Sequence, residues 1–275
     1  MRPEPVPRLL VAGGTILGVL CAVALLAPVL APYDPHALVG GRFEPPSGRH
    51  LLGTDDIGRD ILSGLVWGAR SSIPLAFAVG SLALVLGTLV GAGAASAGGW
   101  VDAAIARLLD IALALPGIPL LVLIGALAGP RRLVLVGVMV MLFWPPVARL
   151  VRSQTLTLRQ RGYVGAAHGF GAGVAYVVWR HLAPAIGPLL VARFVQIAGA
   201  AVLLDAGLAF LGVGDATATS WGLALNRALG HPGLFFTDAW LWWVLPPAVA
   251  VTVAVLGFTF VGVGLEGRFN PRLRR

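Results

Sequence analysis

The chain contains no lysine, because all 20 of its basic residues are arginine. A Walker A phosphate-binding loop needs a lysine on the nucleotide phosphates, and a Schiff-base enzyme needs a lysine amine. The sequence therefore excludes both classes, and the chain has no P-loop with which to hydrolyse ATP. Cys21 is the single cysteine, which excludes an intramolecular disulfide and a cysteine-based zinc cluster.

Charge is also scarce. Charged residues make up 12% of the 275 residues and hydrophobic residues make up 57%, whereas about a quarter of a soluble domain is charged. The mean hydropathy is +0.87. This composition excludes a disordered chain, a nucleic-acid-binding tail and an ordinary cytosolic enzyme. It predicts an all-α, polytopic membrane protein.

Six stretches are candidate membrane spans, since a hydrocarbon core about 30 Å thick needs roughly 20 apolar helical residues. They are residues 9–33, 71–101, 111–130, 133–148, 182–214 and 239–265. The fourth is short, and the fifth is doubtful on hydropathy because Arg193 and Asp205 interrupt it. Prolines predict bends in the third and fourth stretches, at Pro116, Pro119, Pro145 and Pro146.

A cleaved signal peptide is the alternative for the first stretch. However, its apolar run is longer than the ~7–15 residues of a signal-peptide core. Pro28 and Pro32 also lie where a small-residue cleavage site would be expected, and Leu20 rather than a small residue precedes Cys21. A retained transmembrane helix is therefore the favoured interpretation.

The arginine distribution predicts the orientation. With the N-terminus inside, the inner segments carry 12 Arg and four acidic residues, a net charge of 12 − 4 = +8. The outer segments carry seven of each, and Arg193 and Asp205 cancel. The positive-inside rule then predicts that both termini are cytoplasmic, with Arg131 and Arg132 as a local exception. A basic inner face suits anionic lipid head groups, so membrane lipid and no nucleic acid is expected as a partner.

Two long loops are candidate sites of function. In the outer loop, Ile57, Ile61, Leu62 and Leu65 recur at helical spacing, which predicts an amphipathic helix near the outer surface. The expected division is therefore an N-terminal helix with its outer loop (1–70) and a five-helix core (71–275). The inner loop, about 149–183, carries five Arg and no acidic residue. It is either a helix–turn–helix that docks on a soluble partner or a solvated connector.

Four stretches in order along the chain carry a resemblance to a known family. They are residues 52–63 (LGTDDIGRDILS) with 68–70, residues 144–154 (WPPVARLVRSQ) with 158–164, residues 165–171 (GAAHGFG) through 180–184, and residues 205–212 (DAGLAFLG) with 220–222 and 270–274. Together they resemble the permease subunit of type I ABC importers, in the C-type subgroup of oligopeptide, dipeptide and nickel systems. The resemblance implies a six-helix permease fold in a bacterial inner membrane.

The resemblance also implies partners and a coupling mechanism. Such permeases pair with a sister permease, bind two ATPase subunits in the cytoplasm, and receive substrate from an extracytoplasmic binding protein. ATP and Mg²⁺ belong to the ATPases, so no cofactor is expected in this chain. The implied ATPase-coupling residues are Gly165, Ala166, Ala167, His168, Gly171 and Pro184. Gly165 stands where the family has a glutamate, and Ala183 replaces the usual leucine.

Arg193 and Asp205 are the two ionisable residues within a predicted span, and such residues are functional candidates by default. They are 12 residues apart, about 18 Å along a helix, so they cannot pair within one straight helix. For Arg193 the alternative is snorkelling to the inner interface. For Asp205 we favour a hydrogen bond to a neighbouring helix or the sister subunit over a substrate contact.

Outer aromatic and histidine residues add two weaker hypotheses. A nickel path is conceivable through His36, His50 and His231, but no spacing resembles a metal site, and no bound metal is expected. The tryptophans that begin the sixth stretch predict an interfacial anchor: Trp240, Trp242 and Trp243.

Competing functions remain open at this point. An autonomous secondary transporter or channel would usually need intramembrane carboxylates or a filter, and Asp205 alone is available. An intramembrane enzyme is remote, because neither His-Glu-x-x-His nor Gly-x-Ser-x-Gly occurs. Within the importer interpretation the expected substrate is a di- or oligopeptide, with nickel or a metal chelate as the alternative.

Overall fold

The computed structural model describes residues 6–128, 131–162, 180, 183–213 and 218–269. Within these ranges every regular element is a helix: α1 (Val6–Leu25), α2 (Ala27–Leu30), α3 (Ile61–Ala97), α4 (Gly99–Ala114), α5 (Gly117–Ala128), α6 (Arg132–Arg159), α9 (Ala183–Phe210), α10 (Trp221–Leu229), the 3-10 helix η2 (Leu234–Phe236), α11 (Ala239–Trp243) and α12 (Leu245–Phe269).

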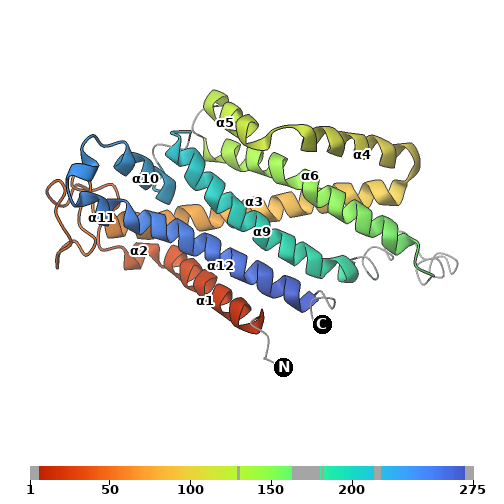
Figure 1. Cartoon of the computed structure of the whole chain (residues 1–275), viewed down its shortest axis with the longest axis horizontal. Helices are drawn as coiled ribbons and strands as arrows, with labels where there is room; N and C mark the ends of the chain where they lie inside the picture. Colours follow the sequence, from red (N-terminus) through yellow and green to blue (C-terminus); the bar gives the residue numbers. More distant parts are fainter. Residues whose placement is uncertain (1–5, 129–130, 163–179, 181–182, 214–217, 270–275) are drawn as a thin grey trace.

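The long helices form a bundle with short elements gathered at one end (Figure 1). The helix α3 contacts α1, α6 and α9, and α12 packs against both α1 and α9. We call the end formed by residues 31–60 and 218–244 the capped end. The opposite end, where α6 finishes at Arg159, is the basic end. Because the long helices alternate in direction, α1 begins and α12 finishes at the basic end (Figure 1).

Five helices are long and apolar enough to cross a membrane, and α4 with α5 makes a sixth span if this bent pair counts as one. This confirms the all-α fold with six spans. The doubt about the fifth stretch was wrong, since α9 is continuous. The helix is interrupted in the third stretch instead, where α4 and α5 are bent by 80° at Pro116. The ring of a proline disfavours a helical conformation of the residue before it. Pro145 and Pro146, by contrast, lie inside an unbroken α6 of 28 residues.

The predicted amphipathic helix of the outer loop is wrong as a separate element. Ile57 lies in a turn, whereas Ile61 starts α3, which runs for 37 residues to Ala97. Leu62 and Leu65 are therefore on the first turns of a spanning helix, and the division expected at residue 70 falls inside it. Helical periodicity cannot distinguish a surface helix from the first turns of a longer one when no helix-breaking residue separates them.

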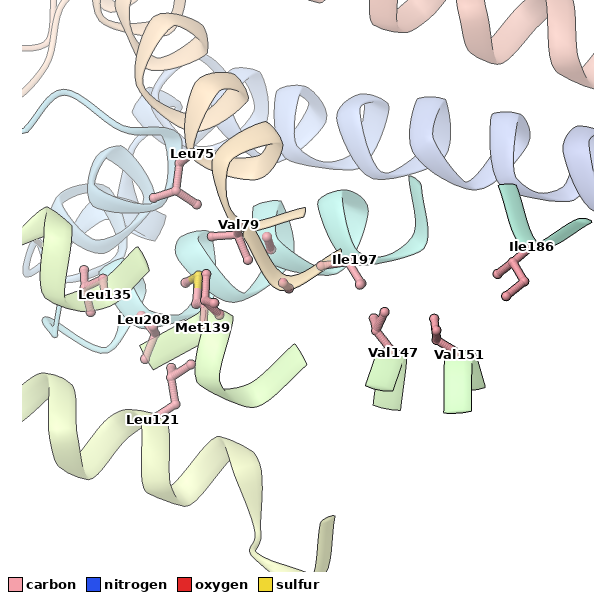
Figure 2. Packing of buried hydrophobic residues seen from close by; sticks show 13 residues of the cluster. Leu75, Val79, Leu121, Leu135, Met139, Val147, Val151, Ile186, Ile197 and Leu208 are labelled. Atoms are coloured by element: carbon pink, nitrogen blue, oxygen red, sulfur yellow. The ribbon is translucent and has the colours of Figure 1, made fainter. Parts of the chain in front are cut away.

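Aliphatic side chains from α3, α5, α6 and α9 form the larger core cluster (Figure 2). Its labelled members are Leu75, Val79, Leu121, Leu135, Met139, Val147, Val151, Ile186, Ile197 and Leu208. A second cluster also includes residues of α3, and in it Phe258 of α12 and Trp221 of α10 are 2% exposed. The helix α3 therefore contributes side chains to both clusters and joins the two halves of the bundle.

Two glycines let α3 and α6 approach at backbone distance. A Cβ atom on Gly87 would lie 2.6 Å from the Cβ of Val147, and one on Gly91 would lie 2.4 Å from the carbonyl oxygen of Ala148. Residues four apart share one helix face. In a membrane, close packing rather than the hydrophobic effect associates helices, and small residues permit it. The Gly-x-x-x-Gly spacing therefore fixes where α6 crosses α3.

The helix α1 is attached to α12 in a similar way. A Cβ on Gly13 would lie 2.7 Å from the backbone nitrogen of Val261 and 2.8 Å from the carbonyl oxygen of Gly257. A Cβ on the neighbouring Gly14 would meet nothing within 4 Å. This close contact makes α1 an integral part of the bundle.

We expect Gly13→Leu to lower the thermal stability of the purified protein, and Gly14→Leu to leave it almost unchanged. Overpacking costs about 1–3 kcal/mol, and here the nearest opposing atoms belong to the backbone of α12. Because both variants gain the same helix-favouring side chain, their difference in Tm in detergent isolates the packing effect. Equal Tm values would contradict the close approach of α1 to α12.

Candidate functional site

A buried polar network fixes the outer loop to the start of α3. The Oδ2 atom of Asp60 accepts hydrogen bonds from the backbone N–H of Ser63 at 2.8 Å and from its hydroxyl at 2.7 Å. The Oδ1 atom lies 3.0 Å from Nδ1 of His50, and both residues are 2% exposed. Tyr33 donates its backbone N–H to the Ser63 hydroxyl and packs its ring against His50. Asp60 thus caps a helix and holds both ends of the loop.

Charged side chains line a small cavity of about 60 Å³ between this loop and α10, among them Asp55, Arg59 and Arg227. The Oδ1 atom of Asp55 accepts the backbone N–H groups of Ile57 and Arg59 at 3.0 and 2.8 Å. Burial nevertheless raises the pKa of the Asp55 carboxyl above its usual range. Burial likewise lowers the pKa of Arg227. The cavity therefore places opposite charges in a partly desolvated setting at the capped end.

A wider cleft of about 310 Å³ opens beside it, between the start of α6 and the outer part of α3. Arg132 donates hydrogen bonds to the hydroxyl and the carbonyl oxygen of Ser71. The Arg70 guanidinium lies 5.1 Å from the ring centre of Trp67, a cation–π distance. Among the described residues that line this cleft, none is acidic. Arg132 therefore helps to line a basic recess.

Asp205 of α9 faces α3. Its Oδ2 atom lies 3.4 Å from the hydroxyl of Ser72, which donates to it. This contact is a hydrogen bond to a neighbouring helix, as favoured from the sequence, although a substrate contact stays untested. Arg193 donates to the Oε1 atom of Gln196 at 3.0 Å, so the structure places Arg193 and Asp205 in separate contacts.

The predicted ATPase-coupling residues fall almost entirely outside the described part of the chain. Gly165, Ala166, Ala167, His168 and Gly171 all lie there. Pro184 is described, and it lies exposed in the first turn of α9, where a proline is tolerated because that turn needs no backbone N–H donor. The coupling role of this loop therefore stays a prediction.

His231 packs among aromatic side chains at the capped end, whereas His50 belongs to the polar network around Asp60. The His231 ring lies 5.0 Å from that of Phe43 and 5.8 Å from that of Trp243. Trp243 is 3% exposed, so its assignment as an interfacial anchor was wrong. It lies under the outer loop, and Trp240 and Trp242 pack against the same cluster. Within the described ranges, no three His, Cys, Asp or Glu residues are grouped as metal ligands.

At the basic end, arginines of α6 bind carboxylates of α4. Arg152 makes a two-pronged contact with Asp102, Nε to Oδ1 at 2.6 Å and Nη2 to Oδ2 at 2.7 Å. Arg149 pairs with Asp110. From the sequence, these charges indicate only the orientation of the chain. A spacing signal was present, because residues 149 and 152 share a face of α6 and residues 102 and 110 share a face of α4.

An apolar groove of about 510 Å³ lies between α6 and the α4–α5 pair, next to the 80° break. Leu115, Leu120 and Met141 are among its lining residues. Leu127 and Leu133 nearby are 78% and 86% exposed. On membrane-spanning helices, an apolar face of this kind lies against lipid or against another helix.

This bundle defines the class of the protein, a polytopic membrane protein with a polar cap at one end and arginines at the other. Residues 55–275 match the family described as "Binding-protein-dependent transport system inner membrane component". Residues 8–46 match the "N-terminal TM domain of oligopeptide transport permease C". The chain therefore belongs to the family of binding-protein-dependent transport permeases, and the resemblance drawn from its motifs is confirmed.

Relatives match along nearly the whole chain. A "Putative peptide permease protein" of Brucella suis biovar 1 is 36% identical over 268 residues, which cover 96% of this chain and 87% of that protein. The "Dipeptide transport system permease protein DppC" of Alkalihalophilus pseudofirmus is 33% identical over 270 residues, with 97% and 87% covered. The family is one of transporter subunits, in keeping with the expectation that the chain is not itself an enzyme.

We expect Asp60→Ala to destabilise the protein by about 2–4 kcal/mol, because it removes a helix cap and leaves His50 buried without its acceptor. Thermal unfolding and the rate of proteolysis within residues 31–59 would both report the loss. Asp56→Ala, in the same loop, is the matched control and should change neither measurement appreciably. Equal effects of the two substitutions would contradict the inference that the hydrogen bonds of Asp60 stabilise the loop and the start of α3.

A double-mutant cycle tests the partner of Asp205. Asp205→Ala and Ser72→Ala should be non-additive by about 0.6 kcal/mol, the usual size of such a bond in a membrane bundle. The measurement is the stability of each single variant, the double variant and the parent protein under one detergent condition. Strictly additive effects would show that Ser72 is not the partner of Asp205.

Proposed function

We propose that this chain is one permease subunit of an ATP-driven, binding-protein-dependent importer of di- and oligopeptides. The observation that carries the proposal is likeness along the whole chain to permeases named for peptide and dipeptide transport, at 33% to 36% identity. The matched N-terminal domain is named for an oligopeptide permease as well.

In this proposal the capped end faces the extracytoplasmic side and the basic end faces the cytoplasm. The charge distribution supports the assignment, since all of the chain's net charge of +8 lies on the segments assigned to the cytoplasm. The cap, built on the buried network around Asp60, then offers the surface on which a substrate-binding protein would deliver peptide.

The proposed partners follow from this orientation. A sister permease would cover the apolar groove of α4, α5 and α6, where large side chains are otherwise exposed. One ATPase subunit would dock on the cytoplasmic loop of this chain that contains Gly165 and Gly171, and a second would dock on the sister permease. Both ATPases would bind ATP and Mg²⁺. This division of labour fits a chain without lysine, which has no P-loop.

The proposal assigns a mechanical role to the chain. Closure of two ATPases on ATP would displace the cytoplasmic loop, and rigid-body movement of helices would alternate access between the two faces. The break between α4 and α5 lies beside the apolar groove. That position suits an element whose rearrangement opens or closes a path between two permeases.

Reconstitution in proteoliposomes tests the proposal. The chain, its co-encoded sister permease, the ATPases and the binding protein should together take up a labelled dipeptide only when ATP is enclosed with the ATPases. Replacing the phosphate-loop lysine of the ATPases should abolish uptake. Ion-gradient-driven uptake by this chain alone would overturn the proposal, and uptake of nickel without peptide would overturn the assignment of the substrate.

A further inference from the structure

Few apolar side chains of α4 are buried against the rest of the chain. Among its 16 residues, Leu109 alone is buried. Trp100 is 81% exposed and Ile111 is 57% exposed, so apolar side chains face away from the bundle. The helix also ends at the 80° break that separates it from α5. Something other than core packing must therefore set its position relative to α6.

The ion pairs at the basic end supply that attachment. In the pair of Asp102 with Arg152, the side chains are 17% and 25% exposed, and two parallel bonds fix their geometry. Bidentate arginine–carboxylate pairs are stronger and more directional than single contacts. Asp102 lies in the first turn of α4, where the helix dipole also favours a carboxylate. The more exposed pair of Arg149 with Asp110 adds a second contact, three residues earlier on α6 and eight residues later on α4.

A third arginine of α6, Arg159, contacts α3, the helix that precedes α4. Arg159 donates to the carbonyl oxygen of Ala95, which lies in the last turn of α3. Carbonyl groups in a last helical turn lack partners within the helix, and a cation there is favourable. The C-terminal part of α6 therefore holds the elbow between α3 and α4 through Arg152 and Arg159, while Arg149 contacts the last turns of α4.

We propose that Asp102 and Arg152 are positioning residues that make α4 follow α6 when the permease changes conformation. This inference rests on the proposed function, because it assigns a route for the ATP-driven movement. In sequence, α6 leads directly into the loop expected to contact the ATPases. A displacement of its end passes through the ion pair to the first turn of α4, and then along that helix to its break beside the groove.

Transport by the complete reconstituted importer tests whether the ion pair couples α4 to α6. Asp102→Asn and Arg152→Gln should lower peptide uptake per ATP hydrolysed by about tenfold, within the range usual for coupling between sites. ATP hydrolysis itself should continue. The exchanged variant Asp102→Arg with Arg152→Asp should recover much of the coupling, because it restores the pair with its charges reversed.

Arg107→Gln is the matched control, since Arg107 is exposed on the same helix and forms no ion pair with any described residue. It should retain the parent ratio of uptake to hydrolysis. If the neutralised variants also retained that ratio, the proposal would fail. A merely structural pair would instead lower the amount of assembled complex while leaving the ratio unchanged, which also overturns it.

A distance measurement tests the coupling of α4 to α6 without relying on peptide uptake. Spin labels at Ala104→Cys and Thr157→Cys, in a Cys21→Ser background with partner cysteines replaced, report the separation of α4 and α6. The distance should stay constant between the nucleotide-free and ATP-bound complexes, and Asp102→Asn should make it change on ATP binding. A constant distance in that variant would overturn the inference. Failure of the parent complex to import peptide would overturn only the proposed function.

Discussion

The close approach of α3 and α6 at Gly87 and Gly91 is the constraint on which the rest of the bundle depends. Apolar side chains gain little by leaving lipid for a helix interface, so helices associate where their surfaces fit closely. With no side chain at either glycine, the backbones meet at Val147 and Ala148. This crossing sets the position of α6 along the axis of α3. It thereby places Arg152 and Arg159 beside the elbow that joins α3 to α4.

Different interactions stabilise the two ends of the bundle. At the capped end, Asp60 and His50 are buried and hydrogen-bonded, and aromatic rings pack beneath the loop. A satisfied buried network of this kind favours one arrangement. At the basic end, α4 is held by partly exposed ion pairs and one buried leucine. Such contacts allow a helix to move as a unit, which suits an element expected to change position during transport.

Two of the motifs that carry the family resemblance acquire physical reasons in the structure. In residues 52–63, Asp60 caps α3 and Thr54 bonds to backbone groups of the folded loop. In residues 220–222, the Trp221 indole donates to the carbonyl oxygen of Leu65 at 2.9 Å. Both motifs therefore assemble the cap and its junction with α3, rather than a catalytic centre. The motif expected to meet the ATPases has Gly165 in place of a glutamate, so any docking there depends on shape instead of that charge.

The sequence by itself determined the class, the number of spans and the family. Long apolar runs must cross a membrane as helices, because lipid offers no partners for backbone polar groups, and the motif order identifies the family. Other features were decided by tertiary structure: the merging of the outer helix into α3, the burial of Trp243, and the pairing of Asp102 with Arg152. Periodicity and charge counts describe one segment at a time. Residues 50 positions apart meet only after glycine-mediated crossings have set how the helices lie against one another.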